Sequence, residues 1–330
     1  MTEVQRELRT DDGARIAYRV TPAIERRPGR AVLLLHGLAS NLTRWSEFVE
    51  HTSLSRRWDV IRLDLRGHGG SIATQPAIGR RLTLERWCSD LAAILDAEGH
   101  PAGVIAGHSL GAQVALHFTV SHPARTTALA LIDPVFRAAL RGRWRLIGRL
   151  GPLLAGGAVL VRALNAAGLR RRNIPALDLR ALDLQAREAL RTGDGGRAFV
   201  RHYSSMRADL RTFRTADYLE DAAELFRPTP APAAIAVPVL TLLSASGTFA
   251  DPAASARVAA GFPRGSTVGI DCHHWPLTER PEEVRAAIER WCAALDAPCA
   301  YRRTTAFDAA PVLWESAHPH SATPPPDPPP

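Results

Sequence analysis

The chain has 330 residues, of which 46% are hydrophobic, and its formal net charge is +8. This length suffices for one large core domain with an insertion. No apolar run is long enough to span a membrane, and the first seven residues lack the apolar core of a signal sequence, so we expect a cytoplasmic protein. The four cysteines show no C-x-x-C spacing, which argues against a disulfide framework or a zinc site.

The chain begins with alternating strand-like and helix-like runs. Two alternating runs flank Asp11-Asp12-Gly13, a hairpin signal that predicts an antiparallel edge of a sheet. Apolar runs predict further strands that are buried on both faces. They lie at 31–35, 60–63, 128–132, 237–243 and near 266–270. Residues 83–98 have apolar positions at helical spacing, and Thr83 offers an N-cap.

Residues 104–113 predict a buried strand, a tight turn and the start of a helix. The turn contains Gly107, Ser109 and Gly111 in a G-x-S-x-G pattern, which by itself is weak and arises by chance about as often as not. The apolar run before it and the apolar-periodic run after it favour a strained turn that exposes the Ser109 hydroxyl. The Leu110 amide would then lie at a helix N-terminus, where it can stabilise an oxyanion.

The alternation of strands and helices stops after Asp133-Pro134. Helical runs interrupted by Gly and Pro follow, and a Pro-rich connector precedes the next strand. The last apolar-periodic run is a helix that opens at Pro281. We therefore predict an α/β core domain at 1–134 and 229–297, a helical lid at 135–228, and a Pro-rich, disordered tail at 298–330.

Arginine supplies every basic residue, and its distribution is uneven. Residues 135–228 hold 18 Arg against 9 acidic residues, and residues 135–177 hold nine Arg and no acid, interleaved with leucines. One interpretation is an ordinary lid with arginines on its wet face. The other is an apolar stripe that lines an acyl pocket and attracts anionic substrates or lipid surfaces. We expect a small-molecule acyl substrate, weak association with anionic surfaces, no transmembrane segment and no nucleic-acid partner.

Four motifs occur in order along the chain. They are His36-Gly37, Asp64-x-Arg66-Gly67-His68-Gly69-x-Ser71, Gly107-His108-Ser109-Leu110-Gly111 and His274-Trp275-Pro276-Leu277-x-Glu279-Arg280-Pro281. Together they resemble the α/β-hydrolase fold superfamily, in the branch of esterases, enol-lactonases, cofactor-free haloperoxidases and carbon–carbon bond hydrolases. The resemblance covers residues 12–296 apart from the lid. It implies an α/β fold with a mostly parallel eight-stranded sheet, helices on both faces and a helical lid inserted after strand 6.

The resemblance also implies roles for individual residues. Ser109 matches the nucleophile, and His274 matches the general base because Trp-Pro follows it at the family spacing. The amides of Leu38 and Leu110 match the oxyanion hole. The resemblance implies no cofactor and no metal. His68 is interpreted as part of a structural loop, and His108 as a packing residue.

Two aspartates compete for the role of the triad acid. Relatives carry it in a Gly-x-x-Asp turn after the seventh strand, but here Phe249 stands at the expected position. Asp251 lies two residues further on, and a slightly longer loop could bring it to His274. The rival is Asp133 after the sixth strand, which could also be only a turn-former before Pro134. Either carboxylate could hold the imidazole tautomer, and we favour Asp251.

These residues predict a serine hydrolase that cleaves a carboxylic ester or a related acyl substrate through an acyl-enzyme. Two alternatives remain open. The first is a carbon–carbon bond hydrolase or a cofactor-free lyase that uses the same triad. The second is a non-catalytic ligand-binding receptor of the same fold, which the displaced acid turn suggests.

Overall fold

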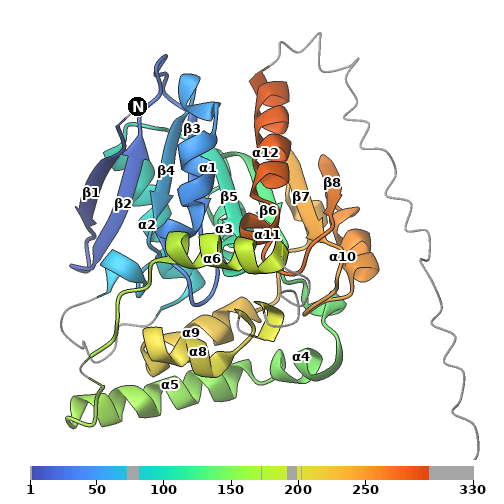
Figure 1. Cartoon of the computed structure of the whole chain (residues 1–330). Coiled ribbons are helices and arrows are strands. Elements are labelled where there is room, and N and C mark those ends of the chain that lie inside the picture. Colours follow the sequence, from blue (N-terminus) through green and yellow to red (C-terminus); the bar gives the residue numbers. More distant parts are fainter. Residues whose placement is uncertain (1, 73–81, 172, 192–198, 202, 297–330) are drawn as a thin grey trace, which may run out of the picture.

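A computed structural model describes residues 2–72, 82–171, 173–191, 199–201 and 203–296 of the chain (Figure 1). The Pro-rich tail predicted at 298–330 lies outside the described residues. Within these residues no helix is long and apolar enough to cross a membrane. Cys88, Cys272 and Cys292 are buried.

The centre of the molecule is an eight-stranded sheet with the order β1-β2-β4-β3-β5-β6-β7-β8. Strand β2 runs antiparallel to both of its neighbours, and the pairs from β4 to β8 are parallel. The strands are β1 Val4–Arg9, β2 Arg15–Thr21, β3 Ala31–Leu35, β4 Asp59–Leu63, β5 Gly103–His108, β6 Thr126–Ile132, β7 Val239–Ser244 and β8 Gly265–Ile270. The predicted fold class, with its antiparallel edge, is confirmed.

Helices cover both faces of the sheet, which explains why its central strands are continuous apolar runs. All five residues of β3 are buried. Its alternate residues Leu33 and Leu35 belong to one apolar cluster, and Val32 and Leu34 to the other, as the two-residue period of a strand requires. One cluster includes α2 Leu84–Ala97, α3 Leu110–Ser121 and α10 Pro252–Ala259, and the other includes α1 Ser46–His51, α11 Pro276–Glu279 and α12 Pro281–Asp296.

The helices of the core begin where the sequence predicts them. Thr83 precedes α2 with an extended backbone, and its hydroxyl accepts a hydrogen bond from the Arg86 amide at 3.3 Å. This bond satisfies one of the free amides of the first turn. Pro281 is the first residue of α12, where the missing N–H costs nothing.

Five described helices lie between β6 and β7, within residues 135–228, which we call the helical insert. They are α4 Gly142–Ile147, α5 Gly151–Ala166, α6 Leu179–Arg191, α8 Met206–Thr212 and α9 Thr215–Leu225. Figure 1 shows most of the insert below the sheet, with α5 farthest from it. Glu220 and Glu224 of α9 accept hydrogen bonds from the amides of Leu82 and Leu84 at 2.8 and 2.9 Å. These contacts fasten α9 to the core.

Candidate active site

Ser109 lies in the turn between β5 and α3, with a backbone φ of 52° and ψ of −108°. Non-glycine residues adopt positive φ values rarely, so the turn is strained and requires small neighbours. A Cβ atom on Gly107 would lie 2.3 Å from the carbonyl carbon of Gly111, and one on Gly111 would lie 2.6 Å from the Leu35 carbonyl oxygen. The two glycines of the G-x-S-x-G pattern are therefore demanded by the close approach of β5, α3 and β3.

We predict that Gly107→Ala lowers the free energy of unfolding by about 3 kcal/mol, because its Cβ would overlap backbone atoms that cannot move aside. The matched control is Gly156→Ala, since a Cβ there meets nothing within 4 Å and the site lies inside helix α5. This control should raise stability by about 0.5–1 kcal/mol. Urea unfolding of both variants measures the difference, and similar stabilities would contradict the close approach.

His274 bridges Ser109 and an aspartate. It lies in the loop after β8 and is 7% exposed. Its Nε2 atom is 3.0 Å from the Ser109 hydroxyl oxygen, and its Nδ1 atom makes a short hydrogen bond with Asp133 Oδ2. The three side chains come from the ends of β5, β6 and β8, which reach the same edge of the sheet. They form a continuous chain of hydrogen bonds from carboxylate to hydroxyl.

Asp133 is held by the end of β7. Its Oδ1 accepts a hydrogen bond from the Ser244 amide at 3.1 Å, and its Oδ2 accepts one from the Ser244 hydroxyl at 2.9 Å. Burial disfavours the charged carboxylate, but attraction to His274 and these hydrogen bonds outweigh it, so the pKa of Asp133 lies below its usual value. Asp133 therefore remains a carboxylate at neutral pH and faces the imidazole N–H.

The contact expected between Asp251 and His274 is not found in the described part of the chain. Asp251 caps helix α10, where its Oδ1 accepts a hydrogen bond from the Ala254 amide at 2.8 Å. Phe249 packs edge-on against the His274 ring, with the ring centroids 4.6 Å apart. The loop after β7 thus brings the Phe249 ring, and no carboxylate, to the His274 imidazole. Asp251 followed by Pro252 is a helix-start signal that the sequence already contained.

His108 supports the position of His274 from within the turn. Its Nε2 is 2.8 Å from the His274 carbonyl oxygen, so this nitrogen carries the proton and donates it. Burial and the neighbouring His274 lower the pKa of His108 to about 3, which keeps the ring neutral. The side chain that the sequence indicated as packing also fixes the backbone of the proposed base.

His68 lies away from this chain of hydrogen bonds. Its ring is fully buried, and its Nε2 is 3.0 Å from Asp221 Oδ2 on α9. Burial alone would lower the pKa of His68, but the charge of Asp221 outweighs this effect and raises it. The motif around His68 therefore connects the core to the helical insert, in agreement with its structural interpretation.

A cavity of about 390 Å³ opens above Ser109, between the core and the helical insert. Leu38 lines it in the turn after β3, and a Cβ atom on Gly37 in the same turn would lie 3.4 Å from the Ser109 Cβ. Leu110 is the first residue of α3, so its amide has no acceptor within the helix. The two residues with the expected oxyanion donors therefore both lie near Ser109.

The walls of the cavity are mostly apolar. Helices α4, α5 and α9 contribute aliphatic and aromatic side chains. They include Trp144, Ile147, Leu154, Leu219, Ala222 and Leu225. Asp209 of α8 is a polar exception. The Tyr218 hydroxyl donates a hydrogen bond to its carboxylate at 3.2 Å, and burial raises the pKa of Asp209 to about 6. Most of this surface is therefore suited to contact with an apolar group.

A buried ion pair joins the core to the insert at the wall of this cavity. Arg44 makes short hydrogen bonds to Asp183 of α6 and to Thr278 of α11. The Tyr203 hydroxyl also donates to Asp183, at 3.0 Å, and the Arg44 guanidinium lies 5.5 Å from the Tyr203 ring centre. Because its charge is neutralised by Asp183, Arg44 positions α6 and is not a free anion-binding group.

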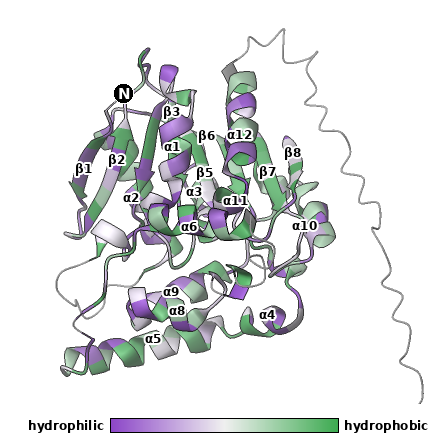
Figure 2. Ribbon diagram, viewed as in Figure 1, coloured by the Kyte–Doolittle hydropathy of each residue, from purple (hydrophilic) through white to green (hydrophobic). Residues whose placement is uncertain are grey.

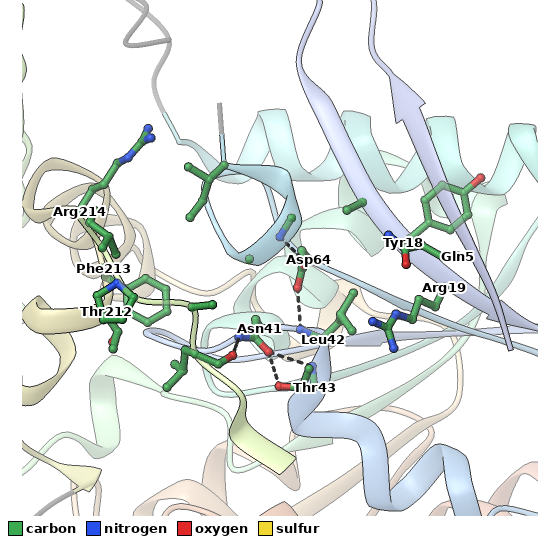
Figure 3. A pocket seen from close by; sticks show the side chains of 18 of the residues that line it. Gln5, Tyr18, Arg19, Asn41, Leu42, Thr43, Asp64, Thr212, Phe213 and Arg214 are labelled. Atoms are coloured by element: carbon green, nitrogen blue, oxygen red, sulfur yellow. Dashed lines mark hydrogen bonds between the residues drawn. The ribbon is translucent and has the colours of Figure 1, made fainter. Parts of the chain in front are cut away.

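A second cavity, of about 510 Å³, lies between β2 and the helical insert (Figure 3). Several of its polar lining groups pair with one another, as the dashed lines in Figure 3 show. Asp64 Oδ1 accepts a hydrogen bond from the Leu42 amide at 2.7 Å, and Asn41 Nδ2 donates one to the Leu177 carbonyl at 2.6 Å. Ser109 does not line this cavity. Although it is larger, we therefore place the candidate active site in the cavity above Ser109.

Comparison with known proteins identifies the family of the fold. A sequence model of the Alpha/beta hydrolase family matches residues 32–287, which is more than half of the chain. The chain belongs to the α/β hydrolase family. A solved thermophilic esterase from Thermogutta terrifontis superposes with a TM-score of 0.61, covering 90% of this chain and 100% of that one at 23% identity. At this identity the esterase shows the shared fold alone.

Curated relatives of this α/β hydrolase match it over a shorter region. A Caulobacter vibrioides protein named "Putative carbamate hydrolase RutD" is 30% identical over 131 residues, which cover 38% of this chain and 47% of the relative. Lipase LipV of Mycobacterium tuberculosis is 34% identical over 103 residues, which cover 31% of this chain and 36% of the relative. The matched region thus spans less than half of the length of either relative.

Two residues near the candidate site of this α/β hydrolase have contacts that were not predicted from the sequence. No role was predicted for Ser244, yet it donates two hydrogen bonds to the Asp133 carboxylate. Phe249 was noted only for standing where an aspartate was expected, yet it packs on His274. The available signal for Ser244 was its place at the carboxyl end of β7, beside β6, which ends at Ile132 immediately before Asp133.

Proposed function

We propose that the protein is a serine hydrolase that cleaves a carboxylic ester or a related acyl substrate through an acyl-enzyme. The observation that carries the proposal is the chain of hydrogen bonds from Asp133 through His274 to Ser109, beside a cavity of about 390 Å³. In this proposal Asp133, and not Asp251, is the orienting acid. Asp133 accepts the Nδ1 proton and leaves the His274 Nε2 lone pair directed at the hydroxyl.

The proposed reaction has two halves. His274 Nε2 takes the proton from Ser109 as its oxygen attacks the carbonyl carbon, and the resulting oxyanion accepts hydrogen bonds from the Leu38 and Leu110 amides. The tetrahedral intermediate collapses when His274 returns the proton to the leaving alcohol. Water, deprotonated by the same imidazole, then attacks the acyl-enzyme and releases the carboxylic acid and free Ser109.

The cavity walls indicate which part of the substrate is recognised. Most of the surface contributed by α4, α5 and α9 is apolar, so we propose that it holds an aliphatic or aromatic group of the ester. We also propose that the helical insert acts as a lid, because its inner side chains form the cavity wall opposite Ser109. Its exposed arginines would favour anionic surfaces near the cavity.

A panel of p-nitrophenyl esters of increasing acyl length tests the reaction class and the cavity together. We expect kcat/KM to rise with acyl length until the chain fills the cavity, and then to fall. Stoichiometric labelling of Ser109 by a fluorophosphonate should accompany this activity, because only an activated serine reacts readily. An unlabelled protein with no esterase activity would favour the ligand-binding receptor.

Mass analysis of the products separates the remaining alternative. A carbon–carbon bond hydrolase or a cofactor-free lyase with the same three side chains would be labelled by the fluorophosphonate but would hydrolyse simple esters slowly. Products that result from cleavage of a carbon–carbon bond in a diketone would identify it. Products with the masses of the carboxylic acid and the alcohol that an ester would release support the acyl-enzyme reaction.

A further inference from the structure

Helix α5 exposes an apolar face on the outside of the molecule. Eleven large hydrophobic side chains are exposed in the described residues, and six of them lie between residues 146 and 169. On α5 itself Leu153 is 70% exposed, Leu160 is 62% exposed and Leu164 is 43% exposed. Their spacing of seven and four residues places them on one side of the helix. Figures 1 and 2 show α5 along the outer edge of the insert, with hydrophobic colouring over much of its length.

The opposite side of α5 packs against the rest of the insert. Ala158 is fully buried, and Arg162, the one charged residue in the sequence of this helix, reaches α9. Arg162 Nη2 donates to Asp217 at 2.9 Å and to Glu220 at 2.7 Å. The charge of α5 is therefore neutralised internally. The outer face carries no charged side chain, although it is the face in contact with water.

Exposed arginines flank α5 at both of its ends. Residues 135–177 contain nine arginines and no acidic residue. Arg143 and Arg149 precede α5 and Arg170 follows it, and all three are exposed. Arg171, in contrast, donates to backbone carbonyls of the insert, including that of Phe213 at 2.5 Å. The apolar face thus has exposed arginines at both ends, in a stretch of sequence that contains no acidic residue.

The exposed leucines and the flanking arginines favour one of two partners that could cover this face, a second copy of the chain or a lipid bilayer. A second copy of the chain, paired about a twofold axis, would bring arginines against arginines around the contact, and like charges oppose such pairing. A bilayer with anionic headgroups offers hydrocarbon to the leucines and negative charge to the arginines. We propose that the outer face of α5 docks on an anionic lipid surface, with the helix parallel to the membrane plane.

Docking in this way would bring the candidate active site close to the lipid. Leu154 of α5 lines the cavity above Ser109, beside Trp144 and Ile147 of α4, so α5 carries both the docking face and a part of the cavity wall. Lipophilic esters dissolved in the membrane would then be concentrated next to the cavity. The docking itself does not depend on the proposed hydrolase activity.

Flotation of the full chain with lipid vesicles tests the proposal. The wild-type protein should bind vesicles of phosphatidylcholine and phosphatidylglycerol in equal parts, and bind phosphatidylcholine vesicles at least about tenfold more weakly. High salt should weaken the binding to the anionic vesicles, because it screens exposed charges. Absence of binding to either vesicle would overturn the proposal.

Matched triple variants locate the surface. Replacing Leu153, Leu160 and Leu164 with Gln should reduce vesicle binding at least about tenfold. Val4, Ile24 and Val120 are exposed on the α/β core domain, outside the helical insert, and replacing them with Gln should leave vesicle binding unchanged. These two variants remove the same number of exposed hydrophobic side chains. Equal losses in the two variants would contradict docking through α5, and thermal unfolding checks that both remain folded.

A second pair of variants tests the charges. Changing Arg143, Arg149 and Arg170 to Gln should weaken binding to anionic vesicles by about tenfold or more. Changing Arg257, Arg264 and Arg290 to Gln alters the net charge equally on an exposed part of the core and should have little effect. Equal effects would show that only the net charge of the protein matters and would overturn docking through this face.

Two further measurements separate this proposal from its alternatives. The Ser109→Ala protein should bind vesicles like the wild type, so a failed hydrolase assignment leaves the docking result intact. Sedimentation velocity tests the second copy as an occupant. A dimer that the Leu153, Leu160 and Leu164 variant abolishes, together with no vesicle binding by the wild type, would replace the lipid surface with a second chain.

Discussion

Ser109→Ala is expected to lower kcat for a p-nitrophenyl ester by roughly four to six orders of magnitude. The hydroxyl is the only group of Ser109 that faces His274 Nε2, at 3.0 Å, so its removal eliminates the nucleophile and leaves the cavity intact. The remaining acceleration would come from the oxyanion amides and substrate binding. Folding should be preserved, because alanine is smaller than serine and tolerates the same backbone conformation about as well.

Steady-state kinetics and labelling by a fluorophosphonate measure this loss. A matched control is Ser89→Ala, which removes a hydroxyl that donates to the Glu85 carbonyl at 3.0 Å on the exposed side of α2. This control should retain its kcat and its labelling. Near-normal esterase activity in the Ser109→Ala protein would show that another group is the nucleophile.

Asp133→Asn is expected to lower kcat by roughly three to four orders of magnitude. The amide of asparagine can donate to His274 Nδ1, which would place the imidazole proton on Nε2 and remove the lone pair needed at the Ser109 hydroxyl. The low pKa of Asp133 means that the wild-type carboxylate stays charged across neutral pH. The loss should therefore persist throughout the neutral range.

Asp251→Asn provides the matched control, because it makes the same chemical change in the competing aspartate. Asparagine is as good an N-cap as aspartate, so α10 should remain capped and kcat should change by less than about threefold. The reverse ranking of the two variants would assign the orienting role to Asp251. Small effects from both would contradict a serine hydrolase with an orienting carboxylate.

Local sequence patterns determined most of the core fold. Continuous apolar runs such as Ala31–Leu35 predict strands covered on both faces, and the structure buries every residue of that run. The turn at Ser109 was predictable because its glycines are demanded by contacts between consecutive elements, so the required residue types appear together in the chain. His274 was predicted for a different reason, from the resemblance to the family, because Trp-Pro follows it at the family spacing.

The acid partner of His274 was decided by tertiary structure. Asp133 and Asp251 lie 118 positions apart in the sequence, and each stands where a loop follows a strand. Which carboxylate reaches Nδ1 depends on the path of the loop after β7. Phe249 in that loop packs on the imidazole, and Asp251 begins α10, so Asp133 takes the contact with help from Ser244. The path of this loop cannot be predicted from a periodic pattern of residues in the sequence.

In the helical insert, the sequence determined the composition of the helices, and the tertiary structure decided which side chains face the cavity. The sequence by itself determined that residues 135–177 hold helices rich in leucine and arginine, without acids. It did not determine which leucines would face the cavity and which would face water, because both sets are apolar and both lie at helical spacing. The packing of Arg162 against Asp217 and Glu220 decides this orientation, since burying that charge without its partners would cost several kcal/mol. Only the tertiary structure therefore places Leu154 in the cavity and leaves Leu153 and Leu160 exposed.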